Sequence, residues 1–158
     1  MRVILQRVSR ASVKVEGETI SGIGRGFLVL AAVGPEDGDK DYRYLAEKIV
    51  NLRVFEDENG KMNFSLLKKG GSLLVVSQFT LFADCRKGRR PSFVGAAPPD
   101  KASADFDKFV EILKEYDIPV KTGRFGAMME VELVNDGPVT IILDSQEMLA
   151  VSRRGNPA

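Results

Sequence analysis

Alternating apolar and polar residues near the N-terminus predict extended strands. Residues 2–8 and 12–16 alternate with a period of two, and the continuous apolar run 27–33 is typical of a buried strand. The glycine-spaced stretch 22–26 fits turns, because it lacks the spacing and the strand-helix context of a nucleotide-binding loop. The first part of the chain is therefore expected to be β-structure.

Helical spacing of apolar residues follows this β region. The pattern from Asp39 to Leu52 predicts an amphipathic helix with Asp39 as its N-cap. A second helix is expected to open in the proline-containing segment 96–100 and to end near Tyr116. These two helices have one apolar face each, which must be covered by the strands.

The remaining apolar segments predict further strands. We expect a short strand at 53–55, a strong strand at 73–82, and a hairpin whose arms, 127–134 and 139–143, are joined by the turn 135–137. Residues 1–145 thus form a single compact α/β domain, with a mostly antiparallel sheet or β-barrel and two main helices. Residues 146–158 are expected to be a loose C-terminal tail.

Composition then narrows the chemistry. The chain has 158 residues, 44% hydrophobic and 28% charged, which excludes a wholly disordered, collagen-like or coiled-coil protein. It contains no histidine, so Ser-His-Asp and Cys-His nucleophile systems and histidine metal ligands are excluded. The lone Cys85 cannot form an internal disulfide, and no apolar run is long enough to span a bilayer, so a cytoplasmic protein without a membrane partner is expected.

Positive charge is concentrated locally. The net charge is only +1, but the segment 86–90 carries four positive charges in five residues. Lysine and arginine in such a run can hold nucleic-acid phosphates. A solvated loop explains the same run nearly as well.

Two short motifs are candidate sites. Ser77-Gln78-Phe79-Thr80 places polar side chains at the end of an apolar strand, where they are costly unless paired or used. The pattern alone favours the simpler interpretation that Gln78 and Thr80 face solvent while Phe79 is part of the core. Ser77 or Thr80 could be a nucleophile only if a base other than histidine activated it, and the sequence shows no motif for such a base. Gly137-Pro138 likewise fits a structural turn, although a Gly-Pro pair exposes carbonyls and can adopt a cis bond.

These two motifs belong to a longer series of ordered segments. The series consists of residues 2–3, 7–8, 11–13, 52–55, 60–63, 77–81, 87–93, 122–129 and 135–140. Taken together, these segments resemble the D-aminoacyl-tRNA deacylase family over roughly residues 1–145. The family hydrolyses the ester that joins a D-amino acid to tRNA. Asp105-Phe106 departs from the family pattern, in which Leu-Tyr is usual.

The resemblance implies a homodimer with active sites at the subunit interface. Gly137 and Pro138 would present backbone carbonyls in the partner's site as a gate that excludes L-aminoacyl esters, and Arg7 would support that gate. The partner molecule would be D-aminoacyl-tRNA, bound through its 3′-terminal adenosine and acceptor end. Glycyl-tRNA, which has no side chain to exclude, would also be cleaved.

The resemblance also implies roles for the other candidates. Ser77, Gln78, Phe79 and Thr80 would hold the terminal adenosine and the ester, with main-chain amides around Phe79 and Thr80 stabilising the oxyanion. No metal or organic cofactor is implied, because the tRNA 2′-hydroxyl is thought to assist hydrolysis, with Thr80 the competing nucleophile. The remaining implied residues are Phe125 and Met129 on the pocket wall and Lys87, Arg89 and Arg90 at tRNA phosphates.

Two other classes of function stay open at this stage. A non-catalytic RNA-end binding module would use the same basic run and would stack bases on Phe79 or Phe93, without turnover. A general small esterase is a weaker alternative, since the chain has no nucleophile elbow.

Overall fold

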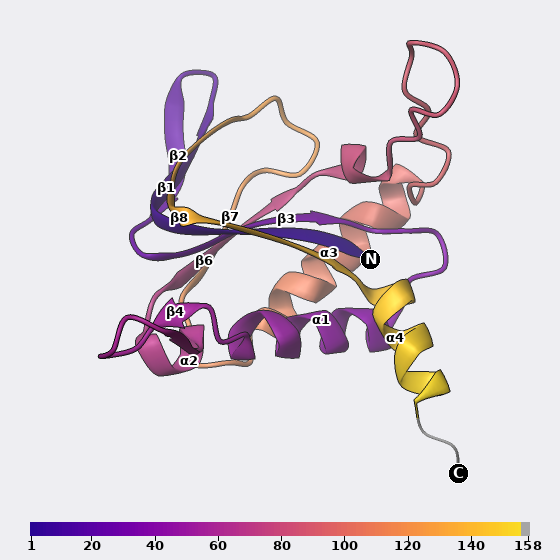
Figure 1. The fold of residues 1–158 in the computed structure, drawn as a ribbon. Helices are drawn as coiled ribbons and strands as arrows, with labels where there is room; N and C mark the ends of the chain where they lie inside the picture. Colours follow the sequence, from indigo (N-terminus) through magenta and orange to yellow (C-terminus); the bar gives the residue numbers. More distant parts are fainter. Residues whose placement is uncertain (156–158) are drawn as a thin grey trace.

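A computed structural model describes residues 1–155 as one mixed α/β domain built on a six-stranded sheet (Figure 1). The expected single α/β domain is thereby confirmed. The sheet has the order β2-β1-β3-β6-β7, and β8 also pairs with β1. Its strands are β1 (Arg2–Val15), β2 (Glu18–Ile23), β3 (Gly26–Ala32), β6 (Ser72–Ser77), β7 (Val120–Thr122) and β8 (Glu130–Asp144).

Strand β1 organises the sheet because it pairs antiparallel with β2, β3 and β8. The β3–β6 and β6–β7 pairs are parallel. The prediction of separate strands at 2–8 and 12–16 was wrong, since β1 is continuous over 14 residues. Along one edge of β1, β3 pairs with the first half of the strand and β2 pairs with the second half. A local alternation pattern does not show that one long strand pairs with two neighbours in this way.

Helices α1 (Asp39–Asn51) and α3 (Pro99–Lys114) lie against one face of the sheet (Figure 1). Both long helices were expected, but the N-cap of α1 is Gly38 rather than Asp39, and the Asp41 carboxylate accepts the Gly38 N–H at 3.0 Å. The shared core beneath them contains the fully buried side chains Tyr42, Leu45, Ile49, Phe109 and Leu113. Smaller elements flank it: β4 (Phe55–Glu56), β5 (Met62–Phe64) and α2 (Leu66–Lys69).

The predicted hairpin at 127–143 was also wrong. Strand β8 runs in one direction from Glu130 to Asp144 and stays paired with β1 along its length. Between the pairs Val8–Asn135 and Gln6–Thr140, β1 advances by two residues while β8 advances by five. The turn-forming residues 136–139 therefore make a bulge in one strand, because β1 is long enough to pair with the chain on both sides of it.

The apolar segment 73–82 does not form one strand. Strand β6 ends at Ser77, the Gln78 N–H bonds to the Ala31 carbonyl at 2.8 Å, and the chain then forms the 3₁₀ helix η1 (Phe79–Phe82). The strand prediction failed here because an apolar run does not show where the neighbouring strand β3 stops. This change of direction carries Phe79 and Thr80 out of the sheet.

The predicted loose tail is a helix over most of its described length. Helix α4 (Ser145–Arg154) begins at the N-cap Asp144, whose carboxylate accepts the Gln146 and Glu147 N–H groups. The half-buried Met148 packs against the main core. Residues 156–158 of the predicted tail lie outside the described residues. No helix in residues 1–155 is long and apolar enough to cross a membrane.

Candidate active site

A cavity of about 620 Å³ opens where β6 ends and η1 begins. Its walls come from the end of β3, the start of α3, and the loop between β7 and β8. The cavity is mainly apolar with a small number of polar groups, which is the usual character of a small-molecule site. Its lining residues include Val76, Ser77, Gln78, Phe79, Phe93, Ala97, Phe125, Met129 and Val131.

Five of the candidate residues meet at this cavity. Ser77, Gln78 and Phe79 line it from one side, and Phe125 and Met129 line it from the loop before β8. Phe125 is anchored to the core through Phe106, with ring centroids 6.1 Å apart. The tertiary structure thus brings together residues that are nearly fifty positions apart in the sequence.

Met129 reaches the cavity because Gly123 leaves space for it. A Cβ atom built on Gly123 would lie 2.7 Å from the Met129 sulfur, closer than any real contact. The Gly123 N–H bonds to the Val75 carbonyl at 3.2 Å, which fixes this glycine beside β6. The loop 123–129 is therefore held against the strand that ends in the Ser77–Thr80 motif.

Thr80 lies beside the cavity rather than in its wall. Its Oγ1 atom is 2.5 Å from the Gln78 amide nitrogen, which donates a hydrogen bond to it. An amide is not a base, and no carboxylate or amine contacts this hydroxyl within residues 1–155. The described surroundings of Thr80 therefore contain no group that could take its proton and make it a nucleophile.

The mouth of the cavity exposes large apolar side chains. Phe79 is 54% exposed and packs edge-to-face on Phe93, with ring centroids 5.1 Å apart. Met128, which also lines the cavity, is 91% exposed, and Val94, which follows Phe93 in the sequence, is 90% exposed. Exposed apolar groups around a cavity are typical of a surface that is covered when a ligand or another protein binds.

The Gly137-Pro138 pair lies apart from this cavity. No residue of the bulge 136–139 lines it, within the part of the chain that the structure describes. The Gly137-Pro138 peptide bond is cis. The buried Arg7 donates one hydrogen bond to the Asp136 carbonyl at 2.8 Å and another to the Val54 carbonyl at 2.6 Å. Arg7 thus ties the base of the bulge to the segment that follows α1.

The basic run forms an exposed loop next to the cavity mouth. Two backbone hydrogen bonds between Asp84 and Ser92 close this loop, and Phe93 immediately follows them in the cavity wall. Arg86 is paired with Asp84, and its hydrogen bonds hold the pKa of that carboxyl below its usual value. Within residues 1–155, no carboxylate lies at ion-pair distance from Lys87, Arg89 or Arg90. These three cations are available for phosphates.

Much of the cavity wall consists of residues that no sequence motif indicated. Small residues such as Ala32, Ala97 and Ala102 line it, and nothing in their local pattern distinguishes them from core alanines. The unusual Asp105 does have a structural explanation: it accepts the Tyr42 hydroxyl at 2.7 Å and pairs with Lys101. Burial raises the pKa of Tyr42 above its usual range, and the Asp105 carboxylate raises it further. Asp105 therefore links α3 to α1 through the Tyr42 hydroxyl.

No cluster of potential metal ligands is present within residues 1–155. The candidate chemistry in the cavity thus consists of hydroxyl, amide and main-chain groups on an apolar wall. These groups can bind and orient a substrate and can stabilise developing negative charge through N–H donors.

Known proteins resemble this chain over most of its length. Residues 4–144 match the family model described as D-Tyr-tRNA(Tyr) deacylase. A D-aminoacyl-tRNA deacylase of Thermosipho africanus is 58% identical over 148 residues, which covers 94% of this chain and 99% of the relative. One of Syntrophobacter fumaroxidans is 59% identical over the same shares.

Two solved structures share the fold. The c-Myc DNA Unwinding Element Binding Protein aligns with a TM-score of 0.87 and 48% identity, covering 91% of this chain and 98% of that one. A probable eukaryotic D-amino acid tRNA deacylase aligns with a TM-score of 0.78 over 90% of this chain and 97% of its own. At 21% identity, the second likeness concerns the fold alone.

Proposed function

The chain belongs to the D-Tyr-tRNA(Tyr) deacylase family, and we propose that it hydrolyses the ester bond of D-aminoacyl-tRNA to give free tRNA and the D-amino acid. The observation that carries this proposal is the family match over residues 4–144, a stretch that includes the whole cavity wall. Such a substrate is made and used in the cytoplasm, where we expect this protein to act.

The terminal adenosine and the ester are proposed to occupy the cavity. Phe79, Phe125 and Met129 offer apolar surface to a base, while Ser77 and Gln78 offer hydrogen bonds at the same wall. The N–H groups of Phe79 and Thr80 open η1, where a 3₁₀ helix leaves its first donors without partners in the helix. We assign these two N–H groups to the oxyanion of the tetrahedral intermediate.

Hydrolysis is proposed to proceed without a covalent enzyme intermediate. The Gln78 amide that contacts Thr80 cannot accept its proton, and the sequence has no histidine. The 2′-hydroxyl of the terminal ribose then assists attack by water. Retained hydrolysis by a Thr80→Ala variant would support this route, whereas near-total loss in a folded protein would favour Thr80 as the nucleophile.

Rejection of L-aminoacyl esters is proposed to come from Gly137 and Pro138 of a second copy in a homodimer. The bulge that carries them contributes nothing to the cavity of its own chain within the described residues, so it must act elsewhere if it acts on a substrate. Arg7 keeps the bulge in place through the Asp136 carbonyl.

The first experiment compares release of tyrosine from D-tyrosyl-tRNA and L-tyrosyl-tRNA by the purified protein. We expect fast release of the D-amino acid only. If both esters last as long as in the uncatalysed control while the tRNA still binds, the deacylase function fails and a non-catalytic RNA-end binding module becomes the better account.

Gly137→Ala tests the gate. Its Cβ would lie 2.9 Å from Val139 Cγ2 and 3.1 Å from the Arg7 guanidinium, at a φ of +140° that disfavours any other residue. We expect lower selectivity for the D-ester. Gly60→Ala is the matched control, because Gly60 also has a positive φ but has open space around its Cβ position.

Mixed dimers test whether the gate acts across subunits. The Phe79→Ala chain has an intact gate but a defective cavity wall. The Gly137→Ala chain has an intact cavity wall but a defective gate. If the gate acts in the partner, the mixed dimer contains one complete site, and D-selective hydrolysis rises above that of both parent homodimers. Equal activity of the mixed and parent dimers would contradict an intersubunit gate.

A further inference from the structure

The short helix η1, which carries Phe79 and Thr80, is contacted by the side chain of Arg2. The Arg2 Nη1 atom donates to the Leu81 carbonyl at 3.1 Å, and the guanidinium carbon lies 4.7 Å from the centre of the Phe82 ring. A single 3₁₀ turn has poor hydrogen-bond geometry of its own, so such outside contacts decide how firmly it is placed. Arg2 therefore contacts the last two residues of η1, neither of which lines the cavity.

The other end of the Arg2 guanidinium is fixed by Asp144. Arg2 Nε donates to Asp144 Oδ2 at 2.9 Å, while Asp144 Oδ1 accepts the Gln146 N–H at 2.9 Å. Burial would raise the pKa of Asp144, but the hydrogen bonds from Arg2 and the helix N–H groups hold it below its usual value. The carboxylate is thus oriented by the start of α4 and in turn orients Arg2.

The Phe82 ring is also confined on the side of the loop after β3. A Cβ atom on Gly34 would lie 3.3 Å from Phe82 Cζ, so the absence of a side chain at Gly34 allows the ring to pack closely. The backbone of Arg2 is fixed by its neighbour Met1, whose side chain is buried and whose carbonyl accepts the Ser145 N–H at 2.9 Å. The contact between Arg2 and Phe82 therefore joins two well-anchored parts of the chain.

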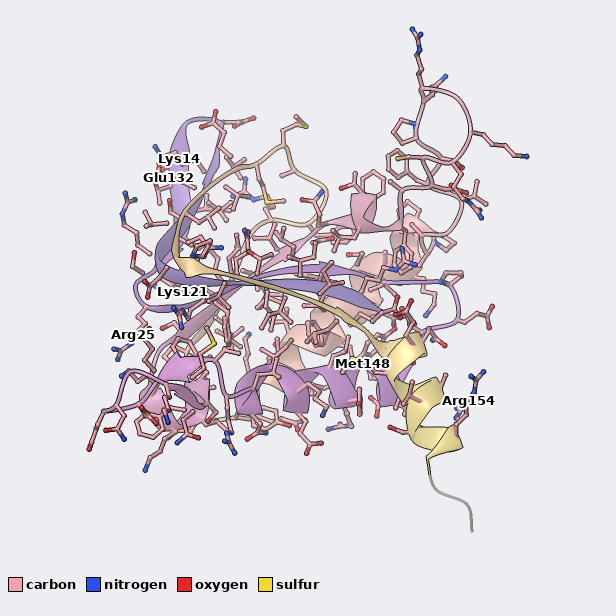
Figure 2. All side chains as sticks on the ribbon, in the orientation of Figure 1. Lys14, Arg25, Lys121, Glu132, Met148 and Arg154 are labelled. Carbon is pink, nitrogen blue, oxygen red and sulfur yellow. The ribbon has the colours of Figure 1, made fainter. Side chains whose placement is uncertain are left out.

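A second arginine on β1 makes the same kind of pair without touching η1. Arg10 Nη1 lies 2.7 Å from Glu132 Oε1 on β8, and the two side chains are 61% and 59% exposed. Glu132 lies at the opposite end of the molecule from α4 (Figure 2). Both arginines bridge β1 to β8, but of the two only Arg2 also contacts η1, the helix that carries Phe79 and Thr80.

We infer that Arg2 is a positioning residue for the proposed deacylase site: it sets the placement of Phe79 and Thr80 by bridging Leu81 and Phe82 of η1 to Asp144 at the start of α4. This inference rests on the proposed function for its catalytic consequence. Arg2 itself does not line the cavity.

The test compares Arg2→Met and Arg2→Lys with Arg10→Met in the full-length protein. We expect Arg2→Met to lower kcat for D-tyrosyl-tRNA roughly 10- to 100-fold with little change in KM, since the donors are misplaced rather than lost. Arg2→Lys keeps a charge but loses the planar fork that spans two acceptors, so it should recover only part of the rate. Arg10→Met should leave both constants unchanged.

Hydrogen exchange of the peptide covering residues 79–83 gives a readout that does not depend on activity. Faster exchange in Arg2→Met than in Arg10→Met supports the inference, even if the wild-type protein hydrolyses no D-ester and the proposed function fails. Unchanged exchange and unchanged kcat in a folded Arg2→Met protein would overturn it.

Asp144→Asn separates the Arg2 contact from the stability of α4. Asparagine is as good an N-cap as aspartate, so the helix start is retained while the acceptor facing Arg2 is replaced by an amide donor or lost. We expect the same faster exchange at 79–83 as in Arg2→Met, with α4 intact. Wild-type exchange at 79–83 in Asp144→Asn would contradict the role given to the bridge.

Discussion

The core beneath α1 and α3 and the mouth of the cavity are both apolar, but they are built in opposite ways. In the core, Leu45 and Phe109 are fully buried by two long helices. At the mouth, Phe79 and Met128 remain largely exposed. Burial of apolar surface is the main source of folding free energy, so the core stabilises the domain, while the mouth leaves apolar surface available for binding.

The comparison predicts that stability depends on one region and activity on the other. Phe109→Ala would remove a fully buried ring from the core and should lower the free energy of unfolding by about 3–5 kcal/mol. Urea denaturation measures this change. Val94→Ala is the control because this side chain is 90% exposed, and its unfolding midpoint should match that of the wild type. Similar losses of stability in the two variants would contradict the distinction between buried and exposed apolar side chains.

Phe79→Ala is expected to show the converse behaviour. The side chain is more than half exposed, so the urea midpoint should change little, whereas kcat/KM for D-tyrosyl-tRNA should fall roughly 10- to 100-fold as base contact is lost. Hydrolysis assays and urea denaturation of the same preparation give both values. A destabilised but fully active variant would show that Phe79 contributes to folding stability and not to substrate binding.

The pH dependence of the unfolding midpoint tests the contact that Asp105 makes between α1 and α3. Burial would raise the pKa of Asp105, but hydrogen bonds from Lys101 and Tyr42 leave it below its usual value. A carboxyl whose folded pKa is lowered contributes stability above its unfolded pKa and loses it as the pH falls through the folded value. Urea midpoints should therefore fall below about pH 4, and by less in Asp105→Asn; an identical acid loss in both proteins would contradict this.

The smallest effect is expected on the outer surface of α1. Arg43 pairs with Asp39 and Glu115, yet more than half of its side chain is exposed to solvent. Solvent and salt screen such pairs, so Arg43→Gln should leave the urea midpoint and the hydrolysis rate unchanged. A clear loss of stability would show that these surface ion pairs matter as a network between α1 and α3.

The sequence predicted the core better than the site. The apolar spacing of α1 and α3 gave their positions to within a few residues, because helical amphipathicity is a local property. The strand endings were wrong at Ser77 and around residues 136–139, since each depends on where a neighbouring strand stops or continues. Both errors fall next to candidate functional residues.

The motifs in the sequence indicated the family and named candidate residues, among them Gln78, Phe79 and Gly137. They were readable because residue type and spacing are properties of the chain itself. The resemblance also implied a shared pocket for Ser77, Phe125 and Met129, but only the tertiary structure showed the contacts that hold such residues in place. Gly123 packs beside β6, Arg7 bonds to the Asp136 carbonyl, and Arg2 bonds to the Leu81 carbonyl in η1. Contacts between distant segments depend on register and packing, which local patterns do not encode.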